Sequence, residues 1–376
     1  MSIVQFNFPT VIRFGEDAVL EATKHLQNNN CKNVLIVTDP VLSKMDVLVN
    51  LQSNLNNAGL KATVFSNIAA NPCETDVSNG VKAFHDNNCD SVVGIGGGAA
   101  MDTARALLLM ANHPSSVMDY EDGTGADETV ISENIPYFIA IPTTSGTGSE
   151  VGRSAIISDD ITHQKKVIYA PQLLAKVILA DPLLTIALPH HITAATGVDA
   201  LVHNVEAFLV DSFHPMCDGI ALEGVKLIDE SLITAVNDPA NIEARTKMLA
   251  ASTMGAVAFQ KGLGVVHSCA HALSAFNNMH HGLANALMFT ESLKFNKSVC
   301  VDKYTRLENL LGVDCFIDYV TKLNESVGIK FGLSNYGVAE SDIDTIVDIA
   351  IADSCHLSNP RAVSKQDFIN ILKASL

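Results

Sequence analysis

The sequence predicts an α/β first domain with a Rossmann-like, largely parallel sheet over residues 1–185, followed by an all-helical second domain over residues 186–376. Three observations predict this fold. Short apolar runs alternate with helical segments in the first half, a turn with three consecutive glycines follows one of the runs, and β-rich runs become rare after residue 185. Because alternating strands and helices are typical of a parallel sheet covered by helices, the two halves are expected to differ in architecture.

Five runs in the first half are predicted to be strands, because each is short, β-rich and continuously apolar. Strands that are covered on both faces of a sheet have this pattern, whereas half-exposed strands alternate between apolar and polar residues. The runs are residues 33–39, 61–68, 91–97, 137–144 and 175–182. Between them, residues 17–29 and 75–88 are expected to form helices.

The second half has the periodicity of buried helices. Residues 192–210 place one apolar stripe at helical spacing, formed by Val198, Leu201, Val202, Val205, Phe208 and Leu209. Residues 243–260 are rich in small side chains and are also expected to form a buried helix.

Composition restricts the classes of function. The chain has 376 residues, of which 48% are apolar, and 24 basic against 41 acidic residues give a formal charge of −17. A surface this acidic repels phosphate backbones, so nucleic acid is not expected as a partner. No apolar run reaches the roughly 18 residues of a membrane-spanning helix, and the first ten residues lack signal-peptide features. The eight scattered cysteines contain no Cys-x-x-Cys pair, which favours reduced thiols in the cytoplasm.

The glycine turn "GIGGGAAMD" (94–102) ends a predicted strand and opens a predicted helix. Glycines allow close approach of a ligand, and a helix start offers free N–H groups to a phosphate. The turn loosely fits the dinucleotide pattern G-x-G-x-x-G/A, although such turns also occur for packing alone. No Lys-Ser or Lys-Thr follows, which excludes a P-loop.

Two further elements of the first half suit a dinucleotide. Asp39 ends a predicted strand, where a carboxylate could accept hydrogen bonds from ribose hydroxyls. This carboxylate would repel a 2′-phosphate and would therefore favour NAD over NADP, while the alternative is an ordinary Asp-Pro turn. The loop "PTTSGTGSE" (142–150) could donate hydroxyl and backbone N–H groups to the cofactor, or could be only a polar turn.

Histidines and one aspartate in the second half have the spacing of metal ligands. Asp199 and His203 lie four residues apart on a predicted helix, and His267 and His271 repeat this spacing. Two more histidines, 280 and 281, follow, and Glu206 lies near the first pair. One carboxylate oxygen with two or three imidazole nitrogens suits Fe(II), Zn(II) or Mn(II). Spacing alone does not decide which of the four late histidines are ligands.

The whole chain resembles the iron-containing, or type III, alcohol dehydrogenases. The segments that carry the resemblance include "GGGAAMD", "IPTTSGTGSEV", "TGVDALVHNVEAF", "HSCAHALSAFNNMHHGLANA" and "NPR" at 359–361. The resemblance implies a dehydroquinate synthase-like two-domain fold and a metal held by Asp199, His203, His267 and His281. It also implies that His271 lies beside the metal near substrate and nicotinamide, where it either relays a proton or orients a ligand. His280 receives no role.

The same resemblance implies a set of cofactor-binding residues in the first domain and at the junction. These are Asp39, Asn71, Gly97, Gly98, Ala99, Asp102, Thr143, Thr144, Lys165, Leu184 and Leu188. Three positions depart from the family pattern. Ala99 stands where serine is usual, Arg105 where lysine is common, and Gly152 where threonine is usual, and these changes are expected to affect cofactor affinity more than reaction type.

The implied reaction is reversible hydride transfer between a small alcohol and NAD, with an aldehyde or ketone in the reverse direction. Iron is the implied metal and zinc satisfies the same ligands, while relatives imply a homodimer or larger homo-oligomer. Three alternatives remain open at this point. They are a dehydroquinate synthase-like lyase that uses NAD, a zinc-dependent polyol dehydrogenase of the glycerol type, and a non-catalytic sensor of NAD or metal.

Overall fold

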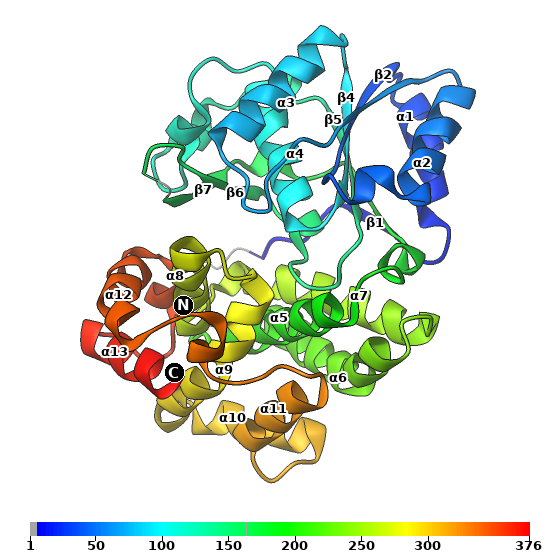
Figure 1. Ribbon diagram of the computed structural model, residues 1–376. Helices are drawn as coiled ribbons and strands as arrows, with labels where there is room; N and C mark the ends of the chain where they lie inside the picture. Colours follow the sequence, from blue (N-terminus) through cyan, green and yellow to red (C-terminus); the bar gives the residue numbers. More distant parts are fainter. Residues whose placement is uncertain (1–5, 163) are drawn as a thin grey trace. The chain divides into compact units, whose positions relative to one another are not determined.

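The computed structural model describes residues 6–162 and 164–376 (Figure 1). Its contacts divide the chain into two compact units. We call the first the α/β unit, which comprises Pro9–Thr144 and Ser149–Thr185. The second, the helical unit, comprises Ile186–Leu376 together with the loop Ser145–Gly148 and residues 6–8.

A six-stranded sheet forms the centre of the α/β unit, and its strand order is β1-β8-β5-β4-β2-β3. All of its strand pairs are parallel. The strands are β1 (Val11–Phe14), β2 (Asn33–Val37), β3 (Lys61–Phe65), β4 (Ser91–Gly96), β5 (Tyr137–Pro142) and β8 (Val177–Ala180). Five of them correspond to the five predicted runs, and the prediction of a parallel α/β sheet is confirmed.

Helices cover both faces of this sheet (Figure 1). The helices are α1 (Ala22–Asn28), α2 (Asp46–Asn57), α3 (Glu74–Asp86) and α4 (Gly98–Met110). α1 and α2 pack their leucines on one face of the sheet, against alternate residues of β2, β4, β5 and β8, while α3 and α4 lie on the other face. Because both faces are covered, β4 is buried over its whole length, which explains its continuously apolar sequence.

Three strands were not predicted. β1 lies at the edge of the sheet and is mostly exposed. β6 (Ser154–Ser158) and β7 (Lys165–Tyr169) form a separate antiparallel hairpin in which β6 alternates between buried and partly exposed residues. None of the three has the continuous apolar run on which the strand predictions depended.

The helical unit contains nine α-helices in the part of the chain that the structure describes. They are α5 (His190–Leu209), α6 (Pro215–Asn237), α7 (Ile242–Ala258), α8 (Val265–Asn277), α9 (His281–Asn296), α10 (Val301–Leu311), α11 (Phe316–Ser326), α12 (Ile343–Ala352) and α13 (Lys365–Ala374). α5 is the central helix and packs against α6, α7 and α9. It is buried from Thr193 to Leu209, and the prediction of an all-helical second half is confirmed.

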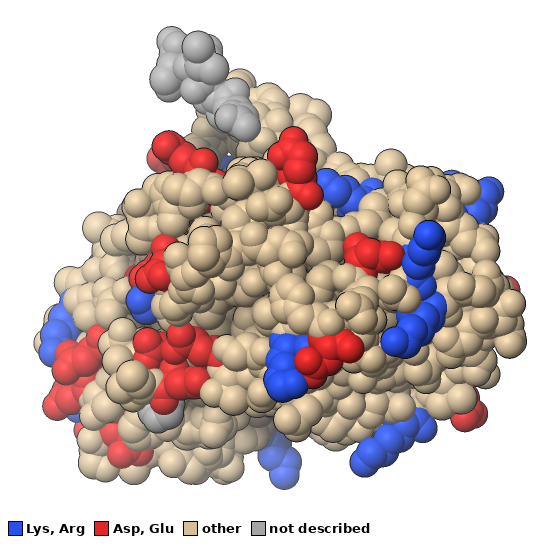
Figure 2. Space-filling view, turned by 90° about the horizontal axis from the view of Figure 1, so that it is seen from above, with Lys and Arg blue, Asp and Glu red and all other residues tan. Residues whose placement is uncertain are grey.

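The charges on one face and the lengths of the helices can be compared with the expectations from composition. On the face shown in Figure 2, acidic and basic side chains are interspersed, and the described residues form no broad basic area there. Over the described residues, none of the helices taken singly is long and apolar enough to cross a membrane. The bent pair of segments Ile242–Lys261 and Val265–Asn277 has the length and composition of a membrane-spanning segment when its two halves are counted together.

Candidate metal and dinucleotide sites

The candidate metal site begins on the buried central helix α5. Asp199 and His203 lie one helical turn apart, so both side chains project from the same face of α5. Both are almost fully buried, with 1% and 4% of their surface exposed. A buried carboxylate and a buried imidazole are costly unless they are paired or bind a cation.

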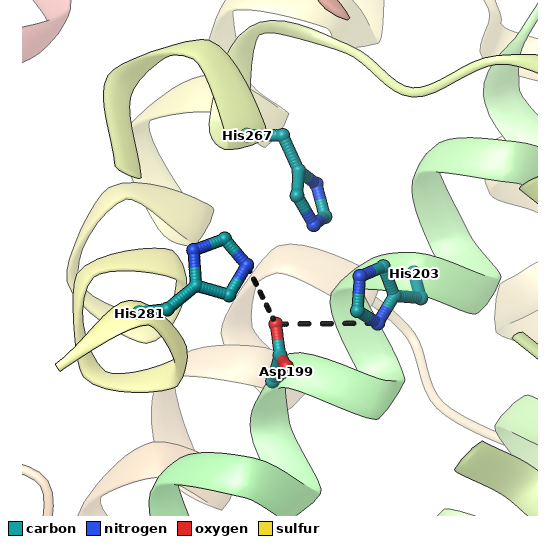
Figure 3. Close-up of side chains that lie close together, drawn as sticks. All are labelled: Asp199, His203, His267 and His281. Atoms are coloured by element: carbon teal, nitrogen blue, oxygen red, sulfur yellow. Dashed lines mark ion pairs between the residues drawn. The ribbon is translucent and has the colours of Figure 1, made fainter. Parts of the chain in front are cut away.

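Two histidines from other helices complete the group (Figure 3). His267 belongs to the first turn of α8, and His281 is the first residue of α9. One ligand atom from each of Asp199, His203, His267 and His281 lies within 4.8 Å of the others. The Oδ1 atom of Asp199 is 3.6 Å from Nε2 of His281 and 4.0 Å from Nδ1 of His203. Figure 3 shows the four side chains pointing toward one another.

The electrostatics of this group suit a divalent cation. Burial lowers the pKa values of His267 and His281 well below the ordinary histidine value, so both imidazoles are neutral near pH 7 and offer lone pairs. Burial alone would raise the pKa of Asp199, but the neighbouring histidines hold it below its ordinary value. One carboxylate oxygen and three imidazole nitrogens are a donor set that Fe(II) and Zn(II) accept, and the residues present therefore fit the implied metal.

Outer partners bind the Nδ1 atoms of two of these histidines. Nδ1 of His267 is 2.6 Å from Oε2 of Glu206, whose Oε1 accepts a hydrogen bond from the Val266 N–H at 2.8 Å. Nδ1 of His203 donates to the carbonyl of Gly146 at 3.3 Å. Outer partners of a ligand ring fix its tautomer and its orientation. The bond to Glu206 leaves Nε2 of His267 for the cation.

Asn285 was not predicted, although it contacts three of the four residues. Its side chain is buried, and its Nδ2 lies 2.6 Å from Oδ1 of Asp199, 3.3 Å from Nε2 of His267 and 3.2 Å from Nε2 of His281. Its Oδ1 has no hydrogen-bond partner among the described residues. The four-residue spacing between His281 and Asn285 on α9 was the signal that could have identified it.

His271 lies outside the four-residue group. Its Nδ1 is 2.8 Å from Oδ2 of Asp353, and its ring stacks on that of His281 with 5.2 Å between the centroids. Asp353 was also not predicted. His271, Asp353 and Cys355 form a second group in which one ligand atom from each residue lies within 4.8 Å of the others. His280, which received no role, caps α9, since its Nδ1 accepts a hydrogen bond from the Leu283 N–H at 3.4 Å.

The structure brings several predicted cofactor residues to one edge of the parallel sheet. Gly97 and Thr143 follow directly after β4 and β5, and Asp39 lies two residues after the end of β2, so all three share the carboxyl edge, where ligands of such sheets bind. Gly97 is the N-cap of α4 and forms no side-chain cap, which leaves the first N–H groups of α4, from Gly98 and Ala99, to a ligand. The side chain of Thr144 packs against Gly97.

Asp39 already has one of its oxygens engaged. Its Oδ1 accepts hydrogen bonds from the N–H groups of Val41 and Leu42 at 2.8 and 2.9 Å. Its Oδ2 lies on the side of Gly96, 3.7 Å from the position that a Cβ would occupy there. The carboxylate is therefore held in one orientation at the end of β2.

Asp102 and Lys165 both have hydrogen-bond partners within the α/β unit. Asp102 accepts hydrogen bonds from Ser149 Oγ at 2.9 Å and Arg105 Nη1 at 3.1 Å, and burial raises its pKa. Nζ of Lys165 donates to Oδ1 of Asn71 at 2.9 Å, and burial lowers the lysine pKa. This network orders the start of α4 and the hairpin. The last two predicted residues belong to different units, Leu184 to the α/β unit and Leu188 to the helical unit.

Comparison with known families gives two matches that together cover almost the whole chain. Residues 9–182 match the iron-containing alcohol dehydrogenase family. Residues 193–376 match the C-terminal domain of the Fe-containing alcohol dehydrogenase family.

Individual relatives agree with these matches. The chain is 33% identical to an NAD-dependent methanol dehydrogenase of Bacillus methanolicus over the full length of both chains. It is 36% identical to a 4-hydroxybutyrate dehydrogenase of Cupriavidus necator, over 85% of this chain and 86% of that enzyme. The solved structure of a 1,3-propanediol oxidoreductase superimposes with a TM-score of 0.94 at 31% identity, covering 99% of this chain and 100% of that one. These comparisons favour an alcohol oxidoreductase over the lyase alternative.

Proposed function

The chain belongs to the iron-containing alcohol dehydrogenase family, and from this premise we propose that it transfers hydride between a small alcohol and NAD with the help of a divalent metal. The observation that carries the proposal is the convergence of four ligand atoms, from three helices, within 4.8 Å of one another. The relatives are named for methanol, 4-hydroxybutyrate and 1,3-propanediol, which are small molecules with a hydroxyl group on a terminal carbon. We therefore propose a small primary alcohol, or the corresponding aldehyde, as substrate.

In this proposal Asp199, His203, His267 and His281 hold the metal, for which iron is the first choice and zinc the second. When bound, the cation supplies a Lewis acid for the alcohol oxygen, and NAD supplies the acceptor of the hydride. Glu206 and the Gly146 carbonyl would orient two of the imidazoles. His271, whose side chain is 22% exposed, is proposed to act beside the metal.

We propose that residues 1–185 bind the dinucleotide and that residues 186–376 bind the metal and carry out the chemistry. The support is that Asp39, Gly97 and Thr143 share the carboxyl edge of the sheet and that the first turn of α4 offers uncapped N–H groups to a phosphate. Asp39 would bind the ribose and favour NAD over NADP. Asn71, Gly98, Ala99, Asp102, Thr144, Lys165, Leu184 and Leu188 remain proposed contacts of the cofactor.

The experiment that tests the proposal is a panel of small alcohols offered with NAD or NADP to the full chain loaded with Fe²⁺ or Zn²⁺. NADH formation should require both the metal and an alcohol. The His267→Ala variant should lose the metal and most turnover while NAD binding stays measurable, and His190→Ala, at the exposed start of α5, should behave as the wild type. Undiminished turnover of metal-stripped His267→Ala would contradict the proposal.

Self-association and a reducing compartment are also proposed. β1 is an edge strand with exposed Val11 and Phe14, and an exposed apolar edge can pair with another strand. Light scattering should therefore give the mass of a dimer or a larger homo-oligomer, and Val11→Lys should shift it toward the monomer.

All eight cysteines are free, which supports a cytoplasmic location, testable by cell fractionation.

A further inference from the structure

His271 and His267 occupy successive turns of α8, yet they have different partners. His267 joins the four-residue metal group and pairs with Glu206, whereas Nδ1 of His271 lies 2.8 Å from Oδ2 of Asp353. The side chains of His271 and Asp353 are 22% and 20% exposed, against 1% and 4% for His267 and Glu206. His271 is therefore partly exposed to solvent, whereas His267 is buried.

Asp353 is held in place by bonds to both of its carboxylate oxygens. It follows directly after α12, and its Oδ1 accepts hydrogen bonds from Ser268 Oγ at 2.7 Å and from the Cys355 N–H at 2.8 Å. Ser268 Oγ accepts in turn from the His356 N–H at 2.9 Å. With Oδ1 fixed in this way, Oδ2 has little freedom to turn away from His271.

This arrangement determines which nitrogen of His271 carries hydrogen. The carboxylate stays ionised, because the bonds from His271 and Ser268 outweigh the effect of burial and keep the pKa of Asp353 low. An ionised carboxylate can only accept, so Nδ1 of His271 donates the hydrogen, and in the neutral imidazole the lone pair is then on Nε2. The ring of His271 stacks on that of His281, which is a proposed metal ligand. Nε2 of His271 therefore belongs to a side chain that contacts the metal group.

A second cation site at His271, Asp353 and Cys355 fits less well. Burial raises the pKa of the Cys355 thiol well above its ordinary value, so a thiolate ligand would be costly. The Nδ1 atom of His271 and both oxygens of Asp353 are also already engaged in hydrogen bonds. The geometry therefore fits a histidine ring that is oriented by a carboxylate better than it fits a cation site.

We propose that Asp353 is a positioning residue for the alcohol dehydrogenase reaction, which fixes His271 in the Nδ1–H tautomer so that Nε2 can accept the hydroxyl proton of the substrate. Ser268 supports it by anchoring the second carboxylate oxygen. The inference depends on the proposed function, since it assigns an orienting partner to a histidine of that site. Nε2 of His271 would take the proton as the O–H bond of the alcohol breaks, and the electron pair left on oxygen would form the C=O bond of the aldehyde. The C–H bond of the same carbon would break with its electron pair leaving as hydride, for which NAD, when bound, would supply the acceptor.

The test compares the wild type with Asp353→Asn, Ser268→Ala and a control, Asp348→Asn, which changes an exposed aspartate of α12. Asparagine keeps the size of aspartate but can present its N–H₂ group to the imidazole and so favour the other tautomer. We expect kcat to fall about 100-fold or more, in line with the loss of a proton-transfer group, while both KM values and the metal content stay within about twofold. Ser268→Ala should give a smaller loss, and Asp348→Asn none.

Two further measurements separate orientation from a general structural effect. Nitrogen NMR of histidine in the zinc-loaded protein should place the hydrogen of His271 on Nδ1 in the wild type and on Nε2 in Asp353→Asn. In a His271→Ala background, Asp353→Asn should lower kcat by no more than about twofold, since residues that act as a unit are not additive.

An unchanged tautomer, or an equally large effect of Asp353→Asn without His271, would overturn the inference. If the wild type forms no NADH with any alcohol, the proposed function fails, whereas the NMR measurement still decides whether Asp353 sets the tautomer. Should Asp353→Asn not fold, Ser268→Ala provides the measurement of kcat with the carboxylate retained, and an unchanged kcat would count against the inference.

Discussion

The Oε2 atom of Glu206 lies 2.6 Å from Nδ1 of His267, and both side chains are buried. Glu206 projects from α5, as Asp199 and His203 do, but it faces the outer nitrogen of the histidine instead of the group of four ligand atoms. A carboxylate in this position orients the ring and makes the ligand more basic. α5 therefore supplies two proposed ligands and the support of a third.

Replacing Glu206 with Gln should weaken metal binding about 10- to 100-fold, the usual effect of losing an outer partner of a ligand. Gln can still accept a hydrogen bond from Nδ1, but it has no charge to balance the cation. Competition with a chelator would measure the affinity. Glu223→Gln, an exposed change on α6, is the matched control and should leave the affinity unchanged, and equal affinities of all three proteins would contradict the prediction.

Metal affinity should depend only weakly on pH near neutrality. A group with a lowered pKa takes up its proton only at lower pH, and burial lowers the pKa values of His267 and His281 well below the ordinary 6.5. Protons should therefore compete with the cation for these imidazoles only in more acidic solution. The carboxyl of Glu206 is the exception, since burial raises its pKa to about 7.

Titrations with Zn²⁺ between pH 6.5 and 7.5 should consequently show the release of about one proton or fewer per metal. In Glu206→Gln the proton that Glu206 contributes should no longer be released, because the amide does not titrate. The release of two or more protons in this range would show that the imidazoles are protonated near neutrality, contrary to the prediction.

The sequence predicted the elements of this protein whose signal is local. The spacing of Asp199 and His203 indicated a shared helix face, and the buried strands were recognised by their apolar runs. The different partners of His267 and His271 could not be predicted, because Glu206 and Asp353 lie 61 and 82 residues away from them. No local pattern reports such contacts, so the spacing alone did not distinguish the two histidines, and only the family resemblance assigned them different roles.

Asp39→Gly should reduce the preference for NAD over NADP. Its Oδ1 is engaged by two backbone N–H groups, so the negative charge is fixed at the end of β2, where it would repel a 2′-phosphate. We expect the ratio of kcat/KM for the two cofactors to change by about tenfold or more, which corresponds to about 1.4 kcal/mol. Asp46→Gly, at an exposed position of α2, should leave the ratio unchanged, and an unchanged ratio in Asp39→Gly would show that this residue does not face the ribose.

Gly148→Ala should destabilise the protein. Gly148 has a φ of +58°, and a Cβ there would lie 2.3 Å from Cβ of Ala256 and 2.6 Å from the carbonyl oxygen of Ser252. We expect a loss of about 1–3 kcal/mol in the free energy of unfolding, measured with urea. Gly219→Ala on α6 is the control, since nothing lies within 4 Å of the new methyl group. It should be neutral or stabilising, and equal stability of the two variants would argue against a closely packed loop.

Gly152 and Arg105 should behave as a coupled pair. The guanidinium of Arg105 is fully buried and donates to Ser149 Oγ at 2.8 Å, to the Ser154 carbonyl at 3.1 Å and to Asp102. A Cβ at residue 152 would lie 3.8 Å from Cζ and Nη2 of Arg105 and 3.1 Å from the Ser149 carbonyl oxygen. The further atoms of a threonine would therefore push the guanidinium away from these partners.

Gly152→Thr should lower both the free energy of unfolding and the affinity for NAD, because the displaced network supports the first turn of α4. The smaller ammonium group of Arg105→Lys leaves room for threonine, so the double variant should lose less than the two single changes together. We expect a coupling on the order of 0.5–3 kcal/mol in the free energy of unfolding. If the losses in the free energy of unfolding were additive, the two positions would accommodate change independently. The absence of a side chain at Gly152 would then not be the reason that arginine fits at position 105.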